Sequence, residues 1–438
     1  MDSAVSTGAS APFNIFQRLV RQWDQLHPYN AAQAVKVSGA PDIAELARQW
    51  HQALDCLGIG CVRVNGRGYY HECMNGQAST HSVGRLPEGT TLSQHISAEL
   101  NRPFDHHDPV PFRPFVIQEN GAYWMGLVYQ HWVADSASIR MLLREWFVRV
   151  HDPAAALNRP LRVADAGYWK LFGPERAHWR LVEGVLSSFR WGIRFRRVRR
   201  IEGKRFGNFA TQLHVRELDE GLIESLRPAA RAFGATVNDV FLAAIAQACN
   251  HHVPAQRTSR RQDLALGTIV DLRPYVSDDL SDVFGLFLGF TSVICRPGAL
   301  EDWDTLLHSI SAQSAQHKAS GVPQASIVRM LAGLAAGRFL EREKVIGFYR
   351  KRVPLAGGIS NVNLTGTWAS QYHPSIVQDY VRVSPTGPMM PLVFTATTLC
   401  KRLNLALSYR QAIVPDCRAE LIMTEVTDRL RRFAAGEC

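Results

Sequence analysis

Apolar positions along the first third of the chain predict a mixture of helices and strands. Residues 139–150 carry apolar side chains at i, i+3, i+4, i+7, i+8 and i+11, which is the spacing of one helix face. Residues 42–57 show the same helical pattern, and residues 13–26 indicate a further helix. Residues 30–37 and 123–130 are typical of strands.

The second half of the chain contains a predicted hairpin and a predicted capped helix. Residues 403–410 (LNLALSYR) alternate between apolar and polar side chains and are expected to pair with residues 392–399 (LVFTATTL) through a turn at 400–402. Thr236 and Asp239 fit a capping box ahead of a helix at 240–249. Helices and strands mix without the strict alternation of a doubly wound sheet, and we expect an α/β fold.

Length and composition indicate an ordinary folded protein with two subdomains. Single cores stop growing at roughly 250 to 300 residues, and this chain has 438. Its N-terminus lacks a basic segment followed by an apolar core, and no run of about 18 apolar residues occurs. The eight cysteines form no CxxC pair, which disfavours a zinc site or a disulfide framework. We therefore expect a cytoplasmic, monomeric protein.

Basic residues are concentrated near the middle of the chain. The net charge is +10, and residues 189–205 alone contain seven arginines, one lysine and one glutamate. We interpret this segment as a crossover linker between an N-terminal subdomain (1–188) and a C-terminal subdomain (206–438). Such charge indicates an anionic partner.

Four interpretations of this basic segment remain open. It could be a solvated helix face. Alternatively, Arg196, Arg197 and Arg200 could dock an acidic carrier protein or the phosphates of a pantetheine or coenzyme A arm. A peripheral contact with a membrane is a third alternative, because aromatic and aliphatic residues interleave with the arginines. Nucleic acid is the least supported partner, since no nucleic-acid-binding motif accompanies the charge.

The segment 130–136 (QHWVADS) carries the most informative chemistry. His131 follows the predicted strand at 123–130, and Asp135 precedes the predicted helix, where its carboxylate can accept the free amides of the first turn. Catalytic side chains concentrate in loops of this kind. Taken alone the HxxxD spacing is weak, and a structural histidine beside a helix cap fits it as well.

Several segments in one order strengthen the interpretation. The segment 130–136 resembles the HHxxxDG signature of the condensation domains of nonribosomal peptide synthetases and of the wider chloramphenicol-acetyltransferase-like acyltransferases, which include wax ester synthases and polyketide-associated acyltransferases. Other collinear segments are similar to those of the same families: 99–105 (ELNRPFD), 234–243 (GATVNDVFLA), 271–274 (DLRP), 283–287 (VFGLF), the SNV turn at 360–362, and Gly387-Pro388 before the final hairpin. The sequence departs from the signature at Gln130, in place of the first histidine, and at Ser136, in place of the glycine.

The resemblance implies a fold and a set of site residues. The fold would be two chloramphenicol-acetyltransferase-like subdomains, each a mixed sheet flanked by helices, in a V-shaped pseudo-dimer with a tunnel at their interface. His131 would be the reactive base, and Asp135 would be structural and pair with Arg273. Asn361 would donate to the oxyanion, although a turn asparagine in a left-handed conformation is an equal alternative. Trp132, Ser136 and Ser360 would lie against the substrate.

The resemblance also implies a reaction without a metal or a bound cofactor. A freestanding condensation enzyme would transfer an acyl group from a phosphopantetheine thioester on an acyl or peptidyl carrier protein to a small-molecule amine or alcohol. One alternative is a coenzyme A-dependent O-acyltransferase of the wax ester synthase type. Another is a catalytically silent scaffold that binds carrier proteins, an alternative that Gln130 and Ser136 raise.

Other sequence features favour no competing chemistry. Residues 105–108 (DHHD) contain four metal-ligand side chains, but neighbours in an extended segment point to opposite faces, so we expect no metal site. His251 and His252 are expected to interact with the carbonyls at the end of the helix before them. The chain has no GxSxG elbow, no Walker A motif and no GxGxxG motif.

Overall fold

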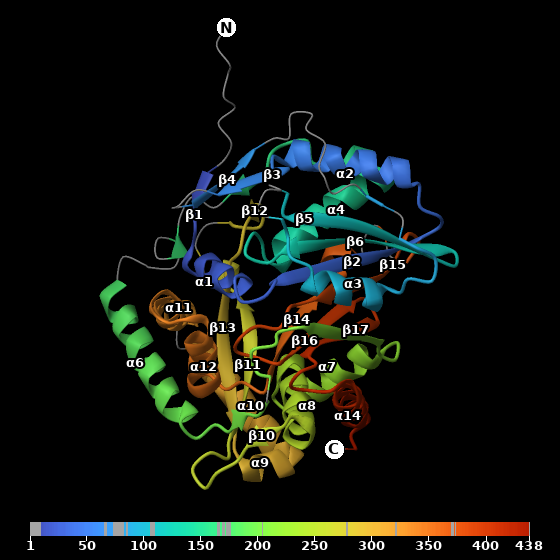
Figure 1. The fold of residues 1–438 in the computed structure, drawn as a ribbon. Helices are drawn as coiled ribbons and strands as arrows, with labels where there is room; N and C mark the ends of the chain where they lie inside the picture. The colour runs from blue at the N-terminus through green and yellow to red at the C-terminus, as the bar shows by residue number, and fades with distance from the viewer. Residues whose placement is uncertain are drawn as a thin grey trace.

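The computed structural model describes residues 10–64, 68–72, 83–84, 86–105, 110–163, 167–168, 171, 177–203, 205–276, 279–319, 322–368, 372 and 374–437. Two sheets dominate this part of the chain, one with four strands and one with six. Figure 1 shows them as the centres of two layered α/β halves, with the four-stranded sheet in the upper half of the view. The expected α/β class with sheets flanked by helices is confirmed, but only the lower of the two large sheets is mixed, because every strand pair of the upper sheet is antiparallel.

The upper sheet is antiparallel and buried on both faces. Its order is β15 (Val377–Val383), β2 (Asn30–Ser38), β6 (Ala122–Gln130) and β5 (Phe112–Glu119). On one side of the sheet lie α2 (Ile43–Leu57) and α4 (Ser136–His151), and α3 (Leu92–Asn101) packs in a separate apolar cluster. Two-sided burial explains why residues 122–129 form an unbroken buried run.

The lower sheet is mixed. Its order is β13 (Leu288–Cys295), β11 (Leu264–Asp271), β14 (Gly357–Asn363), β16 (Leu392–Leu399), β17 (Arg402–Arg410) and β9 (Thr211–Glu217). The pairs β11 with β14 and β14 with β16 are parallel, and the others are antiparallel. Helices α7 (Leu222–Ala232), α8 (Val237–His252), α10 (Trp303–Ala319) and α14 (Asp416–Ala435) pack in its apolar core.

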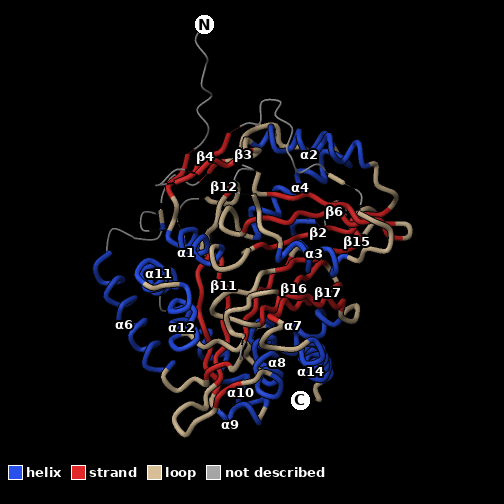
Figure 2. The backbone as a smooth tube through the Cα atoms, viewed as in Figure 1, coloured by secondary structure: helices blue, strands red, loops and turns tan. Residues whose placement is uncertain are grey.

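A third group of helices lies beside the two sheets. Helix α11 (Val322–Phe339) contacts both α1 (Ile15–Asp24) and α6 (Ala177–Phe195), and α12 (Arg342–Arg352) follows it. Figure 2 shows this group at the left of the view. The remaining short elements are β1 (Ser10–Pro12), β3 (Cys61–Val64), β4 (Gly68–Glu72), η1 (Pro153–Ala155), β7 (Arg162–Val163), β8 (Arg200–Ile201), β10 (Ala255–Gln256), η2 (Arg273–Tyr275), β12 (Val283–Phe284), α9 (Pro297–Glu301) and α13 (Thr365–Trp368).

Most local predictions agree with these elements. The hairpin forms with β17 beginning at Arg402, and the capping box of Thr236 and Asp239 is present, so that α8 begins at Val237 rather than at residue 240. One local prediction is wrong: residues 360–362 form no turn, because they lie inside β14 and pair in parallel with β16. His251 and His252 both contact the Glu425 carboxylate of α14, instead of the expected helix carbonyls.

The division of the chain into subdomains stays a prediction. Helix α6 runs without a break through residue 188, where we expected a boundary. Strand β15, from the expected C-terminal subdomain, pairs with β2 in the upper sheet. The expected C-terminal subdomain therefore contributes one strand to the upper sheet.

The described residues also bear on the sequence predictions about membrane spans and metal sites. No single described helix has the length and apolar content to cross a membrane, and only the bent pair α7 and α8 meets these criteria together. No cluster of three His, Cys, Asp or Glu side chains in the described segments is placed to bind a metal ion. Residues 106–108 of the DHHD segment lie outside the described residues.

Candidate active site

A cavity of about 180 Å³ lies where the two sheets meet. The upper sheet contributes residues of β2, β6 and β15 to its wall, and the lower sheet contributes residues of β11, β14 and β16. The beginning of α4 closes one side. His131, Asp135, Ser136, Arg273, Ser360 and Asn361 all line this cavity, so the structure brings six of the predicted site residues together.

His131 is held in one tautomer. Its backbone N–H donates to the Tyr29 carbonyl at 3.1 Å, and its Nδ1 lies 3.1 Å from the Ala134 carbonyl oxygen. Because a carbonyl can only accept, Nδ1 carries the proton and Nε2 presents its lone pair. The ring stacks on Tyr29, with centroids 5.8 Å apart, and meets Tyr129 edge to face at 5.7 Å.

The surroundings keep His131 neutral. Burial lowers the pKa of His131, and the hydrogen bond to Ala134 and the charge of Asp135 oppose this effect only in part. A neutral imidazole with a free Nε2 can accept a proton near neutral pH.

Asp135 is fully buried and accepts five hydrogen bonds. Its Oδ1 accepts from the amides of Ala137 and Ser138, which caps α4, and from Arg273 Nη2. Its Oδ2 accepts from Arg273 Nη1 at 2.7 Å and from the Phe287 amide at 2.8 Å. The expected pairing of Asp135 with Arg273 is therefore present. All five donors occupy the carboxylate, which leaves it no role as a base.

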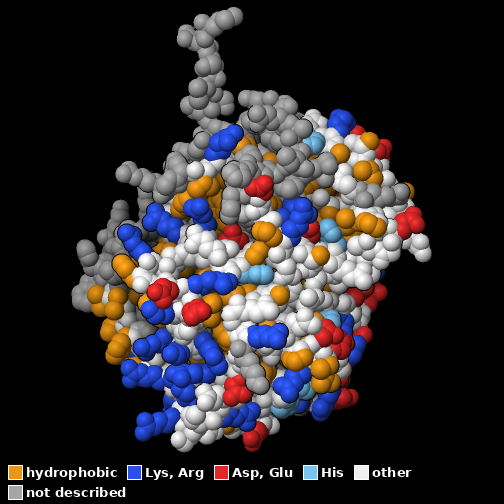
Figure 3. All heavy atoms as spheres, viewed as in Figure 1, with side chains coloured by type: hydrophobic (Ala, Val, Ile, Leu, Met, Phe, Trp, Pro, Cys, Tyr) orange, Lys and Arg blue, Asp and Glu red, His pale blue; other side chains and the backbone are white. Residues whose placement is uncertain are grey.

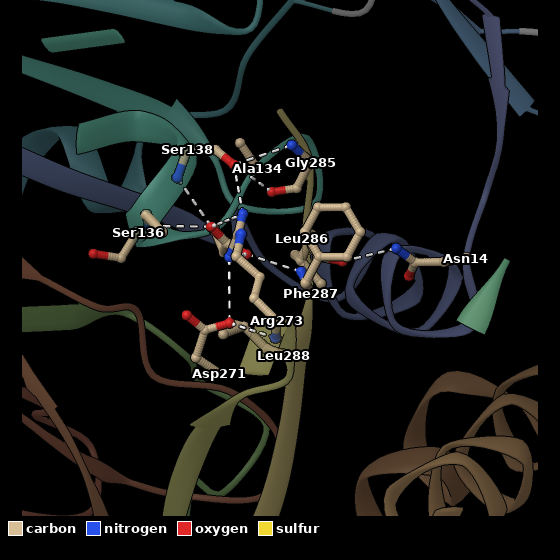
Figure 4. Close-up of polar contacts among 12 residues, drawn as sticks. Asn14, Ala134, Ser136, Ser138, Asp271, Arg273, Gly285, Leu286, Phe287 and Leu288 are labelled. Atoms are coloured by element: carbon tan, nitrogen blue, oxygen red, sulfur yellow. Dashed lines mark hydrogen bonds and ion pairs between the residues drawn. The ribbon is translucent and has the colours of Figure 1, made fainter. Parts of the chain in front are cut away.

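The same contacts keep the Asp135 carboxylate ionised. Burial alone would raise the pKa of Asp135, but the Arg273 guanidinium and the amides of Phe287 and Ser138 hold it below its usual value. Arg273 also lies over the Phe287 ring, 4.7 Å from its centroid. Figure 4 shows Arg273 between Asp271 and Ser138, with the segment from Gly285 to Leu288 running alongside.

The segment 285–288 ties the loop of His131 to the lower half. The Gly285 carbonyl accepts from the Asp135 amide at 3.0 Å and from Ser138 Oγ at 2.9 Å, and the Gly285 amide donates back to Ser138 Oγ. Asn14 Nδ2 donates to the Leu286 carbonyl at 2.8 Å (Figure 4). Because β12 and β13 flank this segment, the position of His131 depends on contacts between the halves.

A second polar group, around Arg382, was not predicted from the sequence. Arg382 Nε donates to Ser136 Oγ at 2.7 Å, and its Nη2 donates to Ser360 Oγ at 2.9 Å. Gln33 Nε2 donates to both oxygens of Ser136. The only sequence signal was a charged residue among the apolar positions of β15.

Asn361 lies in β14 with an unstrained backbone. Cys400 is the one described non-glycine residue with positive φ, so the left-handed alternative for Asn361 is wrong. Its side chain has no hydrogen-bond partner within the described segments and lines the cavity, which leaves its amide available to a substrate.

Trp132 does not contribute to the wall that the structure describes. Its ring is buried against Phe13, with centroids 5.7 Å apart, and under the Arg21 guanidinium at 5.3 Å. Trp132 is not among the described residues that line the His131 cavity, so its predicted place against the substrate stays a prediction.

The basic segment joins other arginines at the surface. Arg196 and Arg197 line a hollow together with Arg260, Arg261 and Arg352. Figure 3 shows Lys and Arg side chains gathered there, at the lower left of the view. Arg200 lies apart in β8, half-buried, where it pairs with Gln256 of β10.

An apolar pocket shares part of its lining with the arginine hollow. It has a volume of about 330 Å³, and Arg196 and Arg352 line both. Leu19 and Met389 also line the pocket, and their chain neighbours Val20 and Met390 line the His131 cavity.

Comparison with known proteins gives matches of structure only. No protein-family model and no curated protein matches the sequence. The condensation domain of the Monacolin K polyketide synthase MokA aligns with a TM-score of 0.63 and 12% identity over 98% of each chain. A mutant starter condensation domain of the rhizomide synthetase RzmA, in complex with C8-CoA and Leu-SNAC, aligns with a TM-score of 0.67 and 12% identity over 98% of this chain and 95% of that chain.

A third similar structure is the X-domain from teicoplanin biosynthesis in complex with OxyB. It aligns with a TM-score of 0.58 and 15% identity over 99% of this chain and 95% of the other. These alignments span nearly the whole chain, so the protein has the fold of a condensation domain. At such identities the likeness establishes the fold and not the reaction.

Proposed function

We propose that the protein is an acyltransferase that moves an acyl group from a thioester to an amine or an alcohol. The observation that carries this proposal is His131, a neutral imidazole whose Nδ1 is fixed on the Ala134 carbonyl and whose Nε2 is free in the cavity. A base in this state suits the removal of a proton from an attacking nucleophile. The fold, shared with a starter condensation domain that binds C8-CoA and Leu-SNAC, supports the same chemistry.

The reaction needs no group beyond the two substrates and the side chains. The acceptor nitrogen or oxygen attacks the thioester carbonyl while its proton passes to His131 Nε2. The tetrahedral oxyanion accepts a hydrogen bond from the free amide of Asn361. Collapse re-forms the carbonyl and breaks the C–S bond, and the imidazolium returns the proton to the leaving thiolate. The product is an amide or an ester, and the other product is a thiol.

The donor is proposed to enter from the side of the arginine hollow. A phosphopantetheine arm, on a carrier protein or in coenzyme A, carries phosphate that the hollow would attract. The apolar pocket that shares Arg196 and Arg352 with the hollow can receive an acyl chain, and its lining residues Leu19 and Met389 are chain neighbours of residues that line the His131 cavity.

The direct test compares His131→Ala with a matched control, His95→Ala. His95 is also half-buried against an aromatic ring, at 4.6 Å from Phe115, and burial also lowers its pKa, but it does not line the cavity. We expect His131→Ala to reduce acyl transfer from N-acetylcysteamine thioesters by roughly 10² to 10⁴ and His95→Ala to leave it nearly unchanged.

A binding scaffold is the second candidate function. It is favoured by the X-domain, which has the same fold and forms a complex with OxyB. The intact protein is a binding scaffold and not an acyltransferase if it binds carrier protein but consumes no thioester of carrier protein or of coenzyme A. Equal activity of His131→Ala and the parent would also reject the proposed mechanism.

A further inference from the structure

Arg382 is a buried cation without a counterion. Its side chain is only 3% exposed, and it lines the His131 cavity. Its hydrogen bonds go to Ser136 Oγ, Ser360 Oγ and the Ala396 carbonyl, all of which are neutral. No carboxylate in the described part of the chain forms an ion pair with it. A buried charge in this state is costly unless something else neutralises it.

Arg140 adds a second cation to the same wall. It lies in the second turn of α4, is half-buried, and makes no ion pair within the described segments. Burial and the charge of Arg140 together lower the pKa of Arg382 to about 10. The charge of Arg140 therefore adds to the cost of keeping the buried Arg382 guanidinium charged, and an anion bound beside both groups would offset this cost.

The carboxylates nearby are already engaged. Asp135 and Asp271 line the cavity, and Arg273 binds both of them. Asp135 has no free acceptor position left, as its five donors show. The wall around Arg382 and Arg140 thus keeps an excess of positive charge.

We infer that the acceptor of the proposed transfer reaction carries a free carboxylate, which binds Arg382 and Arg140 while its amine or hydroxyl faces His131. This inference rests on the proposed function. The planar fork of a guanidinium matches a carboxylate with two parallel hydrogen bonds. The cavity must hold both the carboxylate and the reacting amine or hydroxyl of the acceptor. Since it measures about 180 Å³, the acceptor is a small amino acid or hydroxy acid.

The carboxylate separates two kinds of acceptor. An acceptor tethered to a carrier protein has its tethered carboxyl group converted to a thioester, so it offers no anion to Arg382 unless its side chain carries a second carboxylate. An unattached amino or hydroxy acid does offer this anion. The acceptor is therefore a free small molecule, and only the donor is delivered as a thioester.

Ser136 acquires a role as a positioning residue. It stands where the resembling signature has glycine, and its Oγ accepts from both Arg382 Nε and Gln33 Nε2. Removing the hydroxyl should free the guanidinium to rotate and weaken carboxylate recognition while His131 stays in place.

The experiment measures transfer from an octanoyl N-acetylcysteamine thioester to the proteinogenic amino acids, β-alanine and lactate, each compared with its primary amide. For the best acceptor we expect kcat/KM to be about 10- to 100-fold higher for the acid than for the amide, the value of a hydrogen bond to a charged group. Arg382→Met should bring this ratio close to 1. Arg140→Gln, which breaks no hydrogen bond that the structure shows, should lower it about 3- to 10-fold, and Ser136→Gly should lower it mainly through KM.

Direct binding separates failure of this inference from failure of the proposed function. The same acids and amides are titrated into the parent and into Arg140→Gln by calorimetry without a thioester. Transfer that treats acids and amides alike overturns the carboxylate site and leaves the transfer reaction standing. Binding of acids that Arg140→Gln weakens, without transfer, supports the site and rejects the enzyme. Absence of both transfer and acid-selective binding overturns both.

Discussion

His131 and Asp135 are four residues apart, and their surroundings give them opposite ionisation states. His131 is neutral, because burial disfavours its charged form and its one strong partner is a carbonyl. Asp135 is charged, because a guanidinium and three amides outweigh the cost of burial. One short loop thus supplies a proton acceptor and a fixed structural anion, which is the division of roles that acyl transfer needs.

The lowered pKa of His131 predicts the pH dependence of transfer. The base form must be neutral, so kcat/KM should rise with pH through the pKa of His131 and then level off. Since this pKa lies below the ordinary value of 6.5, the acid limb should be centred below pH 6.5. Initial rates with an uncharged alcohol acceptor, which does not titrate itself, measure the limb. A midpoint above 6.5 would contradict the assigned environment.

Residue-scale prediction from the sequence succeeded where partners are local and failed where they are distant. The cap of α4 by Asp135 follows from a spacing of two or three residues. The contact with Arg273, 138 residues away, came only from a resemblance to known families. Arg382 lies 246 residues from Ser136, and no local pattern connects them. The sequence shows that Arg382 is a charged residue in a mostly apolar segment, but it does not show which residues surround it.

At the scale of elements, the N-terminus of α4 is the joint between the two halves. The helix is capped by Asp135, and the same carboxylate binds Arg273 of η2 and the amide of Phe287 before β13. An ordinary cap satisfies the first-turn amides alone. The Asp135 cap also binds Arg273 and the Phe287 amide, and the position of His131 depends on these contacts.

Asp135 and Asp42 offer a matched pair of caps. Asp42 is exposed and accepts only from the Glu45 amide at the start of α2, so Asp42→Ala should lower the free energy of unfolding by about 0.5 to 2 kcal/mol. Asp135→Ala also leaves the buried Arg273 with only the more distant Asp271 carboxylate, at 3.4 Å, and should lower the free energy of unfolding by about 3 to 5 kcal/mol. Urea denaturation measures both. Equal losses would show that the ion pair adds nothing to the cap.

The elements themselves were predicted better than their arrangement. Local apolar patterns located β6, α4 and the hairpin of β16 and β17, although these three strands are buried along almost their whole length rather than at alternate positions. It did not show that β15 joins the upper sheet, because strand pairing over 340 residues leaves no mark on a local pattern. Residues 360–362 were mistaken for a turn because the segment was matched to the SNV turn of the resembling families. In the fold these side chains are polar because they line the cavity.

At the scale of the whole molecule, arginines from three parts of the chain gather around one surface hollow. The sequence located Arg196 and Arg197 in a basic segment, and the fold adds Arg260, Arg261 and Arg352 from two other places in the chain. Helix α6 leads to this hollow and exposes an apolar stripe with helical spacing at Val182, Val185, Leu186, Phe189 and Ile193. Charge beside an exposed apolar stripe suits an acidic carrier protein, and it also suits an anionic membrane.

Charge reversal in the hollow separates these partners. Arg196→Glu, Arg197→Glu and Arg260→Glu together should raise the KM for a carrier-bound donor at least tenfold and leave transfer from an uncharged N-acetylcysteamine thioester unchanged, because exposed charges mainly steer encounter. The effect should fade as added salt shortens the screening length to about 4 Å near 0.5 M. Reversal of Arg200, half-buried outside the hollow, is the matched control and should have a smaller effect on KM. If the triple variant instead loses binding to phosphatidylserine vesicles and keeps its KM for carrier-bound donor, the hollow serves a membrane. If neither property changes, the arginines form a solvated surface and the donor enters elsewhere.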